Sequence, residues 1–358
     1  MYKNLACLFP TWLCSPEAGQ ELRRPILQKL FRCFTLCLLG IAFATSSIKA
    51  MGQSFTPFDP PGSNNTTPLS INSAGVVTGW YSDANGLHGF IRDASGTITS
   101  FDVMSGLLGT TPTSINFGGV ITGYYRDAQS QDHGFIRDAT GAFITFDPQG
   151  SVSTVPFSIN RSGVVAGRYT LADQASHGFA RSANGQLITL DPPGSLSTTA
   201  TSINPSGVIT GYYTPANGGL PRGFLRAPTG AFTTFQVKGS ISTSTFPLSI
   251  NLAGFITGWY RDTSTHGFVR SANGHVTTFD PPGSISTTAT SINPAGVITG
   301  YYIDATRLIH GFLRAAAGGI TTFDVPNSTD TFPFSINQAA ITGYYVDTSG
   351  QHGFVGMQ

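Results

Sequence analysis

The strongest constraint on the fold is a sequence repeat. The tripeptide Ser-Ile-Asn occurs seven times, and successive copies are 44, 44, 44, 47, 42 and 44 residues apart. The copies start at Ser70, Ser114, Ser158, Ser202, Ser249, Ser291 and Ser335. A repeat of this length is a supersecondary unit that cannot bury its apolar face alone, so each unit must pack on its neighbours. The chain is therefore expected to fold as an array of seven similar units.

Each unit predicts four short β-strands. The first ends at Ser-Ile-Asn, and a turn such as Asn116 to Gly119 leads into a second strand rich in β-branched and aromatic residues. The third contains His-Gly-Phe, and a hairpin turn such as Asn184-Gly185 leads into the fourth, which often ends in Phe-Asp. Four strands in a repeat of this length are typical of a propeller blade. The sequence thus predicts an all-β, seven-bladed β-propeller with four strands per blade.

The two ends of the repeat array complement each other. The seventh unit has no fourth strand after His352-Gly353-Phe354, whereas an isolated fourth-strand sequence, Phe55 to Asp59, precedes the first unit. Pairing of this N-terminal strand with the last three strands would close the ring and leave no free sheet edge. An open solenoid would instead need capping units at both ends. We therefore expect closure by the N-terminal strand.

Residues 1–50 differ from the repeats. They carry six Lys or Arg and two Glu, a net charge of +4, and a basic stretch from Arg23 to Arg32 precedes an apolar run from Cys33 to Ala44. Such a run suits the core of a signal peptide and is short for a membrane span. We predict an export segment at 1–50, a propeller at 51–358, and a secreted or periplasmic location. The alternative is an uncleaved membrane anchor.

The composition of residues 51–358 excludes several classes of protein. This part holds thirteen Lys or Arg against 16 Asp and no Glu, a net charge of −3 that argues against nucleic-acid binding. All four cysteines lie in residues 1–50, so the exported chain would have no disulfide, thiol nucleophile or cysteine metal site. We expect a monomer with no membrane span after cleavage.

The repeat resembles the HAF-type extracellular repeats of bacterial proteins, a family named for a His-Ala-Phe motif that follows an Ile-Asn-x-x-Gly element. Here the matching residues are His-Gly-Phe, as in His88-Gly89-Phe90, and the resemblance covers residues 54–358. Glycine in place of alanine departs from the family pattern. The resemblance implies export and repetition, and it supplies no activity and no catalytic residue.

Three polar positions recur around the predicted ring. Histidine stands in His-Gly-Phe in six units: His88, His133, His177, His266, His310 and His352. Aspartate stands a few residues earlier in five: Asp83, Asp127, Asp262, Asp304 and Asp347. Further aspartates end fourth strands and are expected to cap their own turns: Asp59, Asp102, Asp147, Asp191, Asp280 and Asp324. A residue that every blade needs is expected to serve the blade, here through a hydrogen bond between histidine and the preceding aspartate. In a propeller, the loop after the fourth strand and the loop between the second and third strands share one face, so both sets of aspartates and the histidines are expected to lie together at one rim. A metal or ligand site at this rim is the alternative.

The second strands predict part of the core. The two rings of a pair such as Tyr124-Tyr125 point to opposite faces of the strand, and one or both are expected to be buried. The glycine before each pair is expected to admit the backbone or a ring of the neighbouring blade.

Departures from the repeat indicate where a specific site is expected. Arg168 replaces an aromatic residue in the third unit, while Arg222 replaces the histidine and Gln236 the aspartate in the fourth. Lys238 is the only lysine of residues 51–358. Together these four residues predict a patch for an anionic ligand. Drift within a repeat is the alternative explanation.

The sequence holds no Gly-x-Ser-x-Gly, no His-Glu-x-x-His and no glycine-rich phosphate loop. We predict no catalytic residue, no cofactor and no metal. The leading hypothesis is an exported, non-enzymatic propeller that acts as a binding or scaffold module, with a glycan or an envelope component as partner. Repetition would favour multivalent glycan binding. The alternative is an extracellular hydrolase or lyase that acts on polysaccharide, with its site in the central channel or on the Asp/His rim.

Overall fold

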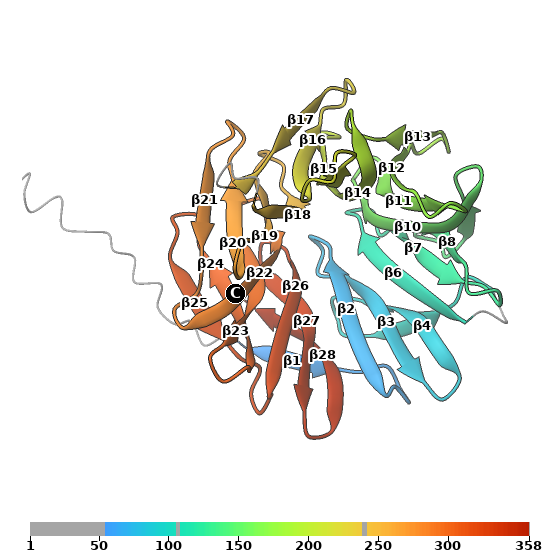
Figure 1. The fold of residues 1–358 in the computed structure, drawn as a ribbon. Helices are drawn as coiled ribbons and strands as arrows, with labels where there is room; N and C mark the ends of the chain where they lie inside the picture. Colours follow the sequence, from blue (N-terminus) through green and yellow to red (C-terminus); the bar gives the residue numbers. More distant parts are fainter. Residues whose placement is uncertain (1–53, 105–107, 238–241, 358) are drawn as a thin grey trace, which may run out of the picture. The chain divides into compact units, whose positions relative to one another are not determined.

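The computed structural model describes residues 54–104, 108–237 and 242–357, all within the unit that spans residues 53–358. The expected export segment, residues 1–50, lies outside the described residues. Those described form β-strands joined by turns and contain no α-helix, so the all-β prediction is confirmed (Figure 1). In this part of the chain, no helix has the length and apolarity that a membrane crossing needs.

The strands follow the four positions predicted for each unit. The first strands are β2 (Asn65–Ile71), β6 (Gly109–Ile115), β10 (Ser151–Ile159), β14 (Ser195–Ile203), β18 (Ser244–Ile250), β22 (Ser284–Ile292) and β26 (Asp330–Ile336). The second strands are β3 (Val77–Asp83), β7 (Ile121–Arg126), β11 (Val165–Leu171), β15 (Ile209–Pro215), β19 (Ile256–Arg261), β23 (Ile298–Asp304) and β27 (Ala340–Asp347).

The outer strands complete the set. The third strands are β4 (Gly86–Arg92), β8 (Asp132–Arg137), β12 (Ser176–Arg181), β16 (Arg222–Arg226), β20 (Thr265–Arg270), β24 (Ile309–Arg314) and β28 (Gly350–Met357). The fourth strands are β5 (Ile98–Phe101), β9 (Phe143–Phe146), β13 (Leu187–Leu190), β17 (Phe232–Phe235), β21 (Val276–Phe279) and β25 (Ile320–Phe323). The remaining strand, β1 (Phe55–Phe58), comes before the first unit.

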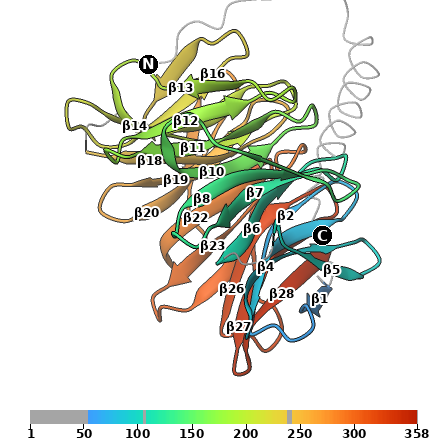
Figure 2. The same cartoon turned by 90° about the vertical axis from the view of Figure 1, so that its right-hand side faces the viewer.

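Within a unit, strands pair antiparallel in chain order, as β6-β7-β8-β9 do. Single parallel residue pairs, Asn65 with Gln351 and Thr265 with Ser286, join units into two eight-stranded sheets. β1 pairs antiparallel with β28, with Phe58 opposite Gly353. The N-terminal strand therefore lies beside the last strand of the chain, as both views show (Figure 1, Figure 2).

The asparagine of each Ser-Ile-Asn links its unit to the next. Asn116 Oδ1 accepts hydrogen bonds from the backbone N–H groups of Gly118 and Val120, which fixes the turn. Each asparagine Nδ2 donates to the backbone carbonyl of the next asparagine, and the last one, Asn337, donates to the first, Asn72, at 2.8 Å. The seven asparagines thus form a continuous circle of buried hydrogen bonds: Asn72, Asn116, Asn160, Asn204, Asn251, Asn293 and Asn337. The turns at these asparagines were predicted from the sequence, but the circle was not.

The core lies between neighbouring units. Ile121 and Phe135 of the second unit are fully buried, and side chains of the first unit, among them Ile91 and Phe101, pack against their cluster. The second ring of each aromatic pair is buried, as Tyr125 is, while the first ring is only partly covered. Burial of these apolar surfaces between units is the main stabilising contribution.

The glycine before each aromatic pair has a different neighbour from the one expected. A Cβ atom on Gly123 would collide with the backbone carbonyl of Thr111, in the first strand of the same unit. The collision arises at a register shift between β6 and β7, where the two backbones come unusually close. The expectation of an approach from the neighbouring blade was therefore wrong, because the first strand of the same sheet already occupies that space.

Candidate functional site

The recurring histidines bind two aspartates each in several units. His133 Nδ1 lies 2.7 Å from Asp147 Oδ2, and its Nε2 lies 3.1 Å from Asp127 Oδ2. The ring also stacks on Tyr125, with 5.1 Å between centroids. The Nδ1 contact to the aspartate after the fourth strand recurs in all six units that carry the histidine. The predicted bond was the one to the preceding aspartate. The aspartates after the fourth strands were expected at the same rim but as caps of their own turns, so their contact with Nδ1 was not predicted.

The two carboxylates act on the protonation of the imidazole. Burial lowers the pKa of His133, but the bonds and charges of Asp147 and Asp127 outweigh burial and hold that pKa above its usual range. The same balance raises the pKa of His88 and of His310. In turn, a backbone hydrogen bond from Gln131, followed by the bond from His133, keeps the pKa of Asp127 low against partial burial.

These contacts occupy the hydrogen-bonding atoms of the imidazole. Both ring nitrogens of His133 are within hydrogen-bond distance of carboxylates, so neither is available as a free general base. Among the described residues, no group of three or more His, Cys, Asp or Glu side chains is arranged to hold a metal ion. The contacts fit the structural role predicted for these residues.

The fourth unit replaces this arrangement. Arg222, at the start of β16, takes the place of the histidine, and Gln236 follows β17 at the same end of the sheet. Gln236 Nε2 donates to the backbone carbonyl of Thr243 at 3.3 Å. Lys238, the fourth residue of the predicted anionic-ligand patch, lies outside the described residues. Arg168 lies elsewhere, beside a cavity that neither Arg222 nor Gln236 lines.

A central cavity of about 560 Å³ lies where first strands of several units meet. Toward the asparagine circle its wall is formed by residues that directly precede Ser-Ile-Asn, and four of these are apolar: Leu69, Phe157, Leu248 and Phe334. Thr113 occupies the same repeat position in the second unit, between Leu69 of the first and Phe157 of the third. Its hydroxyl donates to the carbonyl of Pro156 at 2.9 Å. The inner end of the cavity is therefore largely apolar, because the hydroxyl of Thr113 is used by the backbone.

The space around the first strands is filled unevenly. Phe246 in β18 stacks on Trp259 at 4.0 Å between centroids and meets Tyr212 edge-on at 5.0 Å. Phe332 in β26 similarly stacks on Tyr344 at 4.5 Å. These phenylalanines fill the gaps between neighbouring second strands in the later units.

Smaller residues stand at the equivalent positions of the other five units, including the sixth. Thr111 in β6 and Val155 in β10 line the cavity where phenylalanine would reduce it. The cavity consequently opens beside the first three units, between Trp80, Tyr124 and Arg168 of their second strands. The difference in side-chain volume between units is visible in the sequence, but its meaning depends on knowing that these positions share one space.

Arg168 is one of three charged residues that line this cavity, with Arg126 and Asp132. It occupies the position of Trp80 and Tyr124, and its Cζ atom lies 6.0 Å from the centroid of the Phe157 ring. The arginine thus places a positive charge beside the ring of Phe157, in a cavity that Trp80 and Tyr124 also line. Planar aromatic faces stack on sugar rings or other flat groups, and a guanidinium binds carboxylates in a fixed geometry.

An ion pair lies at the same wall. Arg126 Nε donates to Asp132 Oδ1 at 2.8 Å, and both residues line the cavity. Asp132 is the more buried partner, with 16% of its side chain exposed against 49% for Arg126. The other units carry no such pair at these positions. These two residues were not predicted as site residues, although their departure from the repeat is visible in the sequence.

No family model matches the chain, and no curated protein sequence matches it. Solved structures do. Virginiamycin B lyase of Staphylococcus aureus is similar over 85% of this chain and 99% of its own, with 12% identity and a TM-score of 0.54. A puromycin hydrolase is similar over 81% of this chain and 52% of its own, with 11% identity and a TM-score of 0.58.

A prolyl endopeptidase is similar over 86% of this chain and 50% of its own, with 10% identity and a TM-score of 0.56. The chain thus spans about half the length of the two hydrolases. At such low identities the likeness concerns the fold alone, and the fold is β-propeller-like.

Proposed function

We propose that the protein is an exported seven-bladed β-propeller that binds an acidic glycan in its central cavity. The single observation that carries the proposal is the wall of Trp80, Tyr124 and Arg168 around that cavity. Two aromatic faces supply stacking surface for sugar rings, and the guanidinium supplies a charged partner for a uronate carboxylate. The volume of about 560 Å³ lies in the range of small-molecule sites.

The seven-bladed, closed form of the fold is part of the proposal. It is supported by the seven Ser-Ile-Asn copies, by the pairing of β1 with β28, and by the asparagine circle that returns from Asn337 to Asn72. We assign residues 51–358 to this propeller and residues 1–50 to the export segment. Export to the periplasm or the medium would bring the cavity into contact with envelope or environmental glycans.

Membership in the HAF-type repeat family is also proposed. The departure from the family motif, glycine for alanine, has a physical reason in this chain. A Cβ atom on Gly89 would lie 2.8 Å from the ring of Phe101 and 2.9 Å from the ring of Pro112 in the next unit. The smaller residue lets the fourth-strand phenylalanine pack directly on the third strand.

Replacement of Arg168 tests the binding function. Arg168→Tyr restores the residue type of neighbouring units, so the fold should tolerate it. We expect it to weaken binding of an oligogalacturonate by about tenfold, because a charge-assisted hydrogen bond is lost. The exposed loop residue Arg307 provides the matched control, Arg307→Gln. Calorimetry with a neutral cello-oligosaccharide as the second probe separates charge from stacking.

Three results of this experiment bear on the proposal. Binding of one oligogalacturonate per chain that Arg168→Tyr weakens and Arg307→Gln does not would support a single central site. Several equivalent sites per chain, unaffected by Arg168→Tyr, would support multivalent binding at the repeated positions instead. Absence of binding to either saccharide would overturn the glycan proposal and leave a scaffold role.

The alternative, a polysaccharide hydrolase or lyase, is tested on the same probes. Glycoside hydrolysis commonly uses two carboxylates that flank the scissile bond. Asp132 is the one carboxylate among the described residues that line the central cavity, and Arg126 pairs with it. Release of shortened or unsaturated products from oligogalacturonate, abolished in Asp132→Asn, would establish the enzymatic function in place of binding.

A further inference from the structure

A second pocket lies away from the central cavity and shares no lining residue with it. It has a volume of about 310 Å³ and lies between the fifth and sixth units. Its wall comes from the turns after β18, β20 and β22 and from strands β20, β21 and β24. These turns are at the asparagine end of the sheets, whereas the loops with the Asp–His pairs are at the opposite end.

Two residues of this pocket depart from the repeat. The position of Phe255 is occupied by valine in five other units: Val76, Val120, Val164, Val208 and Val297. Each of those valines packs against a neighbouring core cluster, whereas 37% of the Phe255 surface is exposed and its ring lines the pocket. His275, at the turn between β20 and β21, is likewise particular to this unit.

Arg314 supplies a buried charge on the facing side of the pocket. Only 8% of its surface is exposed, and its guanidinium lies 4.9 Å from the centroid of the Phe279 ring. Its Nη1 donates to the carbonyl of Ala315 at 3.3 Å, but its Nε has no hydrogen-bond acceptor among the described residues. A buried donor without an acceptor carries a free-energy cost, and the residue that holds this donor lines the pocket.

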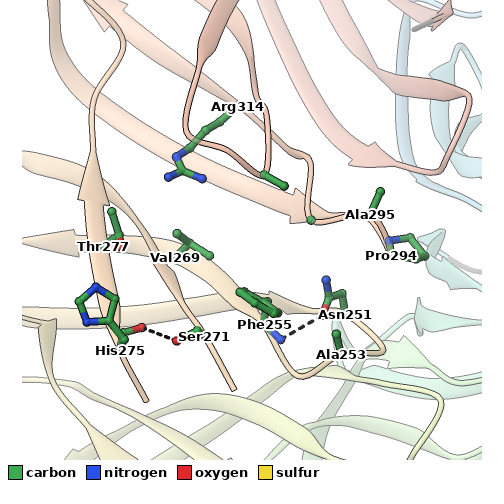
Figure 3. A pocket seen from close by; sticks show the side chains of 12 residues that line it. Asn251, Ala253, Phe255, Val269, Ser271, His275, Thr277, Pro294, Ala295 and Arg314 are labelled. Carbon is green, nitrogen blue, oxygen red and sulfur yellow. Dashed lines mark hydrogen bonds between the residues drawn. The ribbon is translucent and has the colours of Figure 1, made fainter. Parts of the chain in front are cut away.

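The arginine alone does not mark the site. Arg92, Arg137, Arg181 and Arg270 occupy equivalent places and also have an Nε without an acceptor in the described part of the chain. The combination with Phe255 and His275 is what distinguishes this groove. Figure 3 shows Arg314 on one side of the space and Phe255, Val269 and His275 on the other.

The lining chemistry selects a ligand class. The described residues around the pocket include one guanidinium and one imidazole but no carboxylate, which favours a negatively charged group. Phe255, Val269 and Pro294 offer apolar surface to a flat ring. The volume lies at the lower end of the range for small-molecule sites.

We propose that this pocket binds a small aromatic carboxylate. Its ring lies against Phe255 and Val269, and its carboxylate faces Arg314 and His275. This site is independent of the glycan proposed for the central cavity.

Indole-3-acetate is the probe, and tryptamine, which carries the same ring with an ammonium group, is its charge-reversed comparison. Phe255→Val and His275→Gln each introduce a residue that another unit of the repeat has at the equivalent position, so both variants should fold. We expect Phe255→Val to weaken indole-3-acetate binding by about tenfold and His275→Gln by a few-fold. Leu252→Ala is the matched control, since Leu252 is exposed in the same turn and does not line the pocket.

Nuclear magnetic resonance titration of the full chain gives affinity and location together. Chemical-shift changes at the backbone amides of Gly274 and Gly296 would support the site if Phe255→Val weakens binding of indole-3-acetate and Leu252→Ala does not. Equal binding of tryptamine, equal weakening in Leu252→Ala, or no saturable binding at millimolar indole-3-acetate would each overturn it.

Discussion

His352 Nδ1 lies 2.7 Å from Asp59 Oδ2, although the two residues are 293 positions apart. The same contact joins residues only 14 positions apart elsewhere, as between His133 and Asp147. In the last unit this repeated interaction therefore connects β28 to the segment after β1. Because the entropy cost of closing a loop rises with its length, we expect this contact to form late in folding.

Removal of the Asp59 contact tests whether it holds β1 against β28. Asp59→Asn and Asp147→Asn should each lower the free energy of unfolding by about 1 kcal/mol, because each removes one charge-assisted partner of a half-buried histidine. Only Asp59→Asn should increase amide hydrogen exchange in both β1 and β28. Hydrogen-exchange mass spectrometry checks the pattern. Equal exchange at β1 and β28 in the two variants would mean that the contact does not hold the chain ends together.

Deletion of residues 54–59 should be far more damaging than removal of the segment before them. The deletion removes Phe58, which is buried with Ile71 and Phe90, and leaves β28 as a free sheet edge. We expect a lower denaturation midpoint and a concentration-dependent increase in mass. A chain that begins at Ser54 is the control. Unchanged midpoint and mass after the deletion would show that β1 is dispensable.

Stability should depend on pH in two opposite ways. The raised pKa of His88, His133 and His310 gives a contribution that is complete below the ordinary value of 6.5 and is lost as pH rises through the raised values. The lowered pKa of Asp83, Asp127 and Asp304 gives a second contribution to stability, which is complete above 3.8 and is lost as pH falls through the lowered values.

The melting temperature should therefore be highest between these two limits and should decline toward pH 8. Thermal unfolding across pH 3 to 9 measures this. The triple variant His88→Gln, His133→Gln, His310→Gln should flatten the alkaline decline. An alkaline decline of equal size in the variant would mean that other groups cause it.

Gly123→Ala should destabilise the protein by at least about 2 kcal/mol, since the new Cβ atom collides with backbone and cannot be accommodated by a side-chain rotation. Gly319→Ala should change stability by no more than about 0.5 kcal/mol, because nothing lies within 4 Å of its Cβ position. Urea unfolding compares the two. A similar loss of stability in both variants would show that β6 and β7 can move apart to accommodate the new Cβ atom.

The sequence by itself determined the strand pattern and the positions that recur. Alternation of turn residues with β-branched and aromatic stretches predicted the strands within the units, since those preferences are local. The spacing of Ser-Ile-Asn gave the number of units, and the orphan segment Phe55 to Asp59 indicated a partner at the C-terminal end. Each of these inferences needs only neighbouring residues or the repeat itself.

The tertiary structure decided which recurring residues touch. The connectivity of a propeller predicts that the fourth-strand aspartates and the histidines share one rim. The sequence could not show that each aspartate bonds to the histidine of the third strand, or that asparagine side chains join successive units, because both contacts cross strand or unit boundaries. It also could not place Arg168 in a cavity apart from Arg222 and Gln236. Residues at equivalent repeat positions look alike in one dimension, and only packing shows that Phe246 and Phe332 fill a shared space that Thr111 and Val155 leave open.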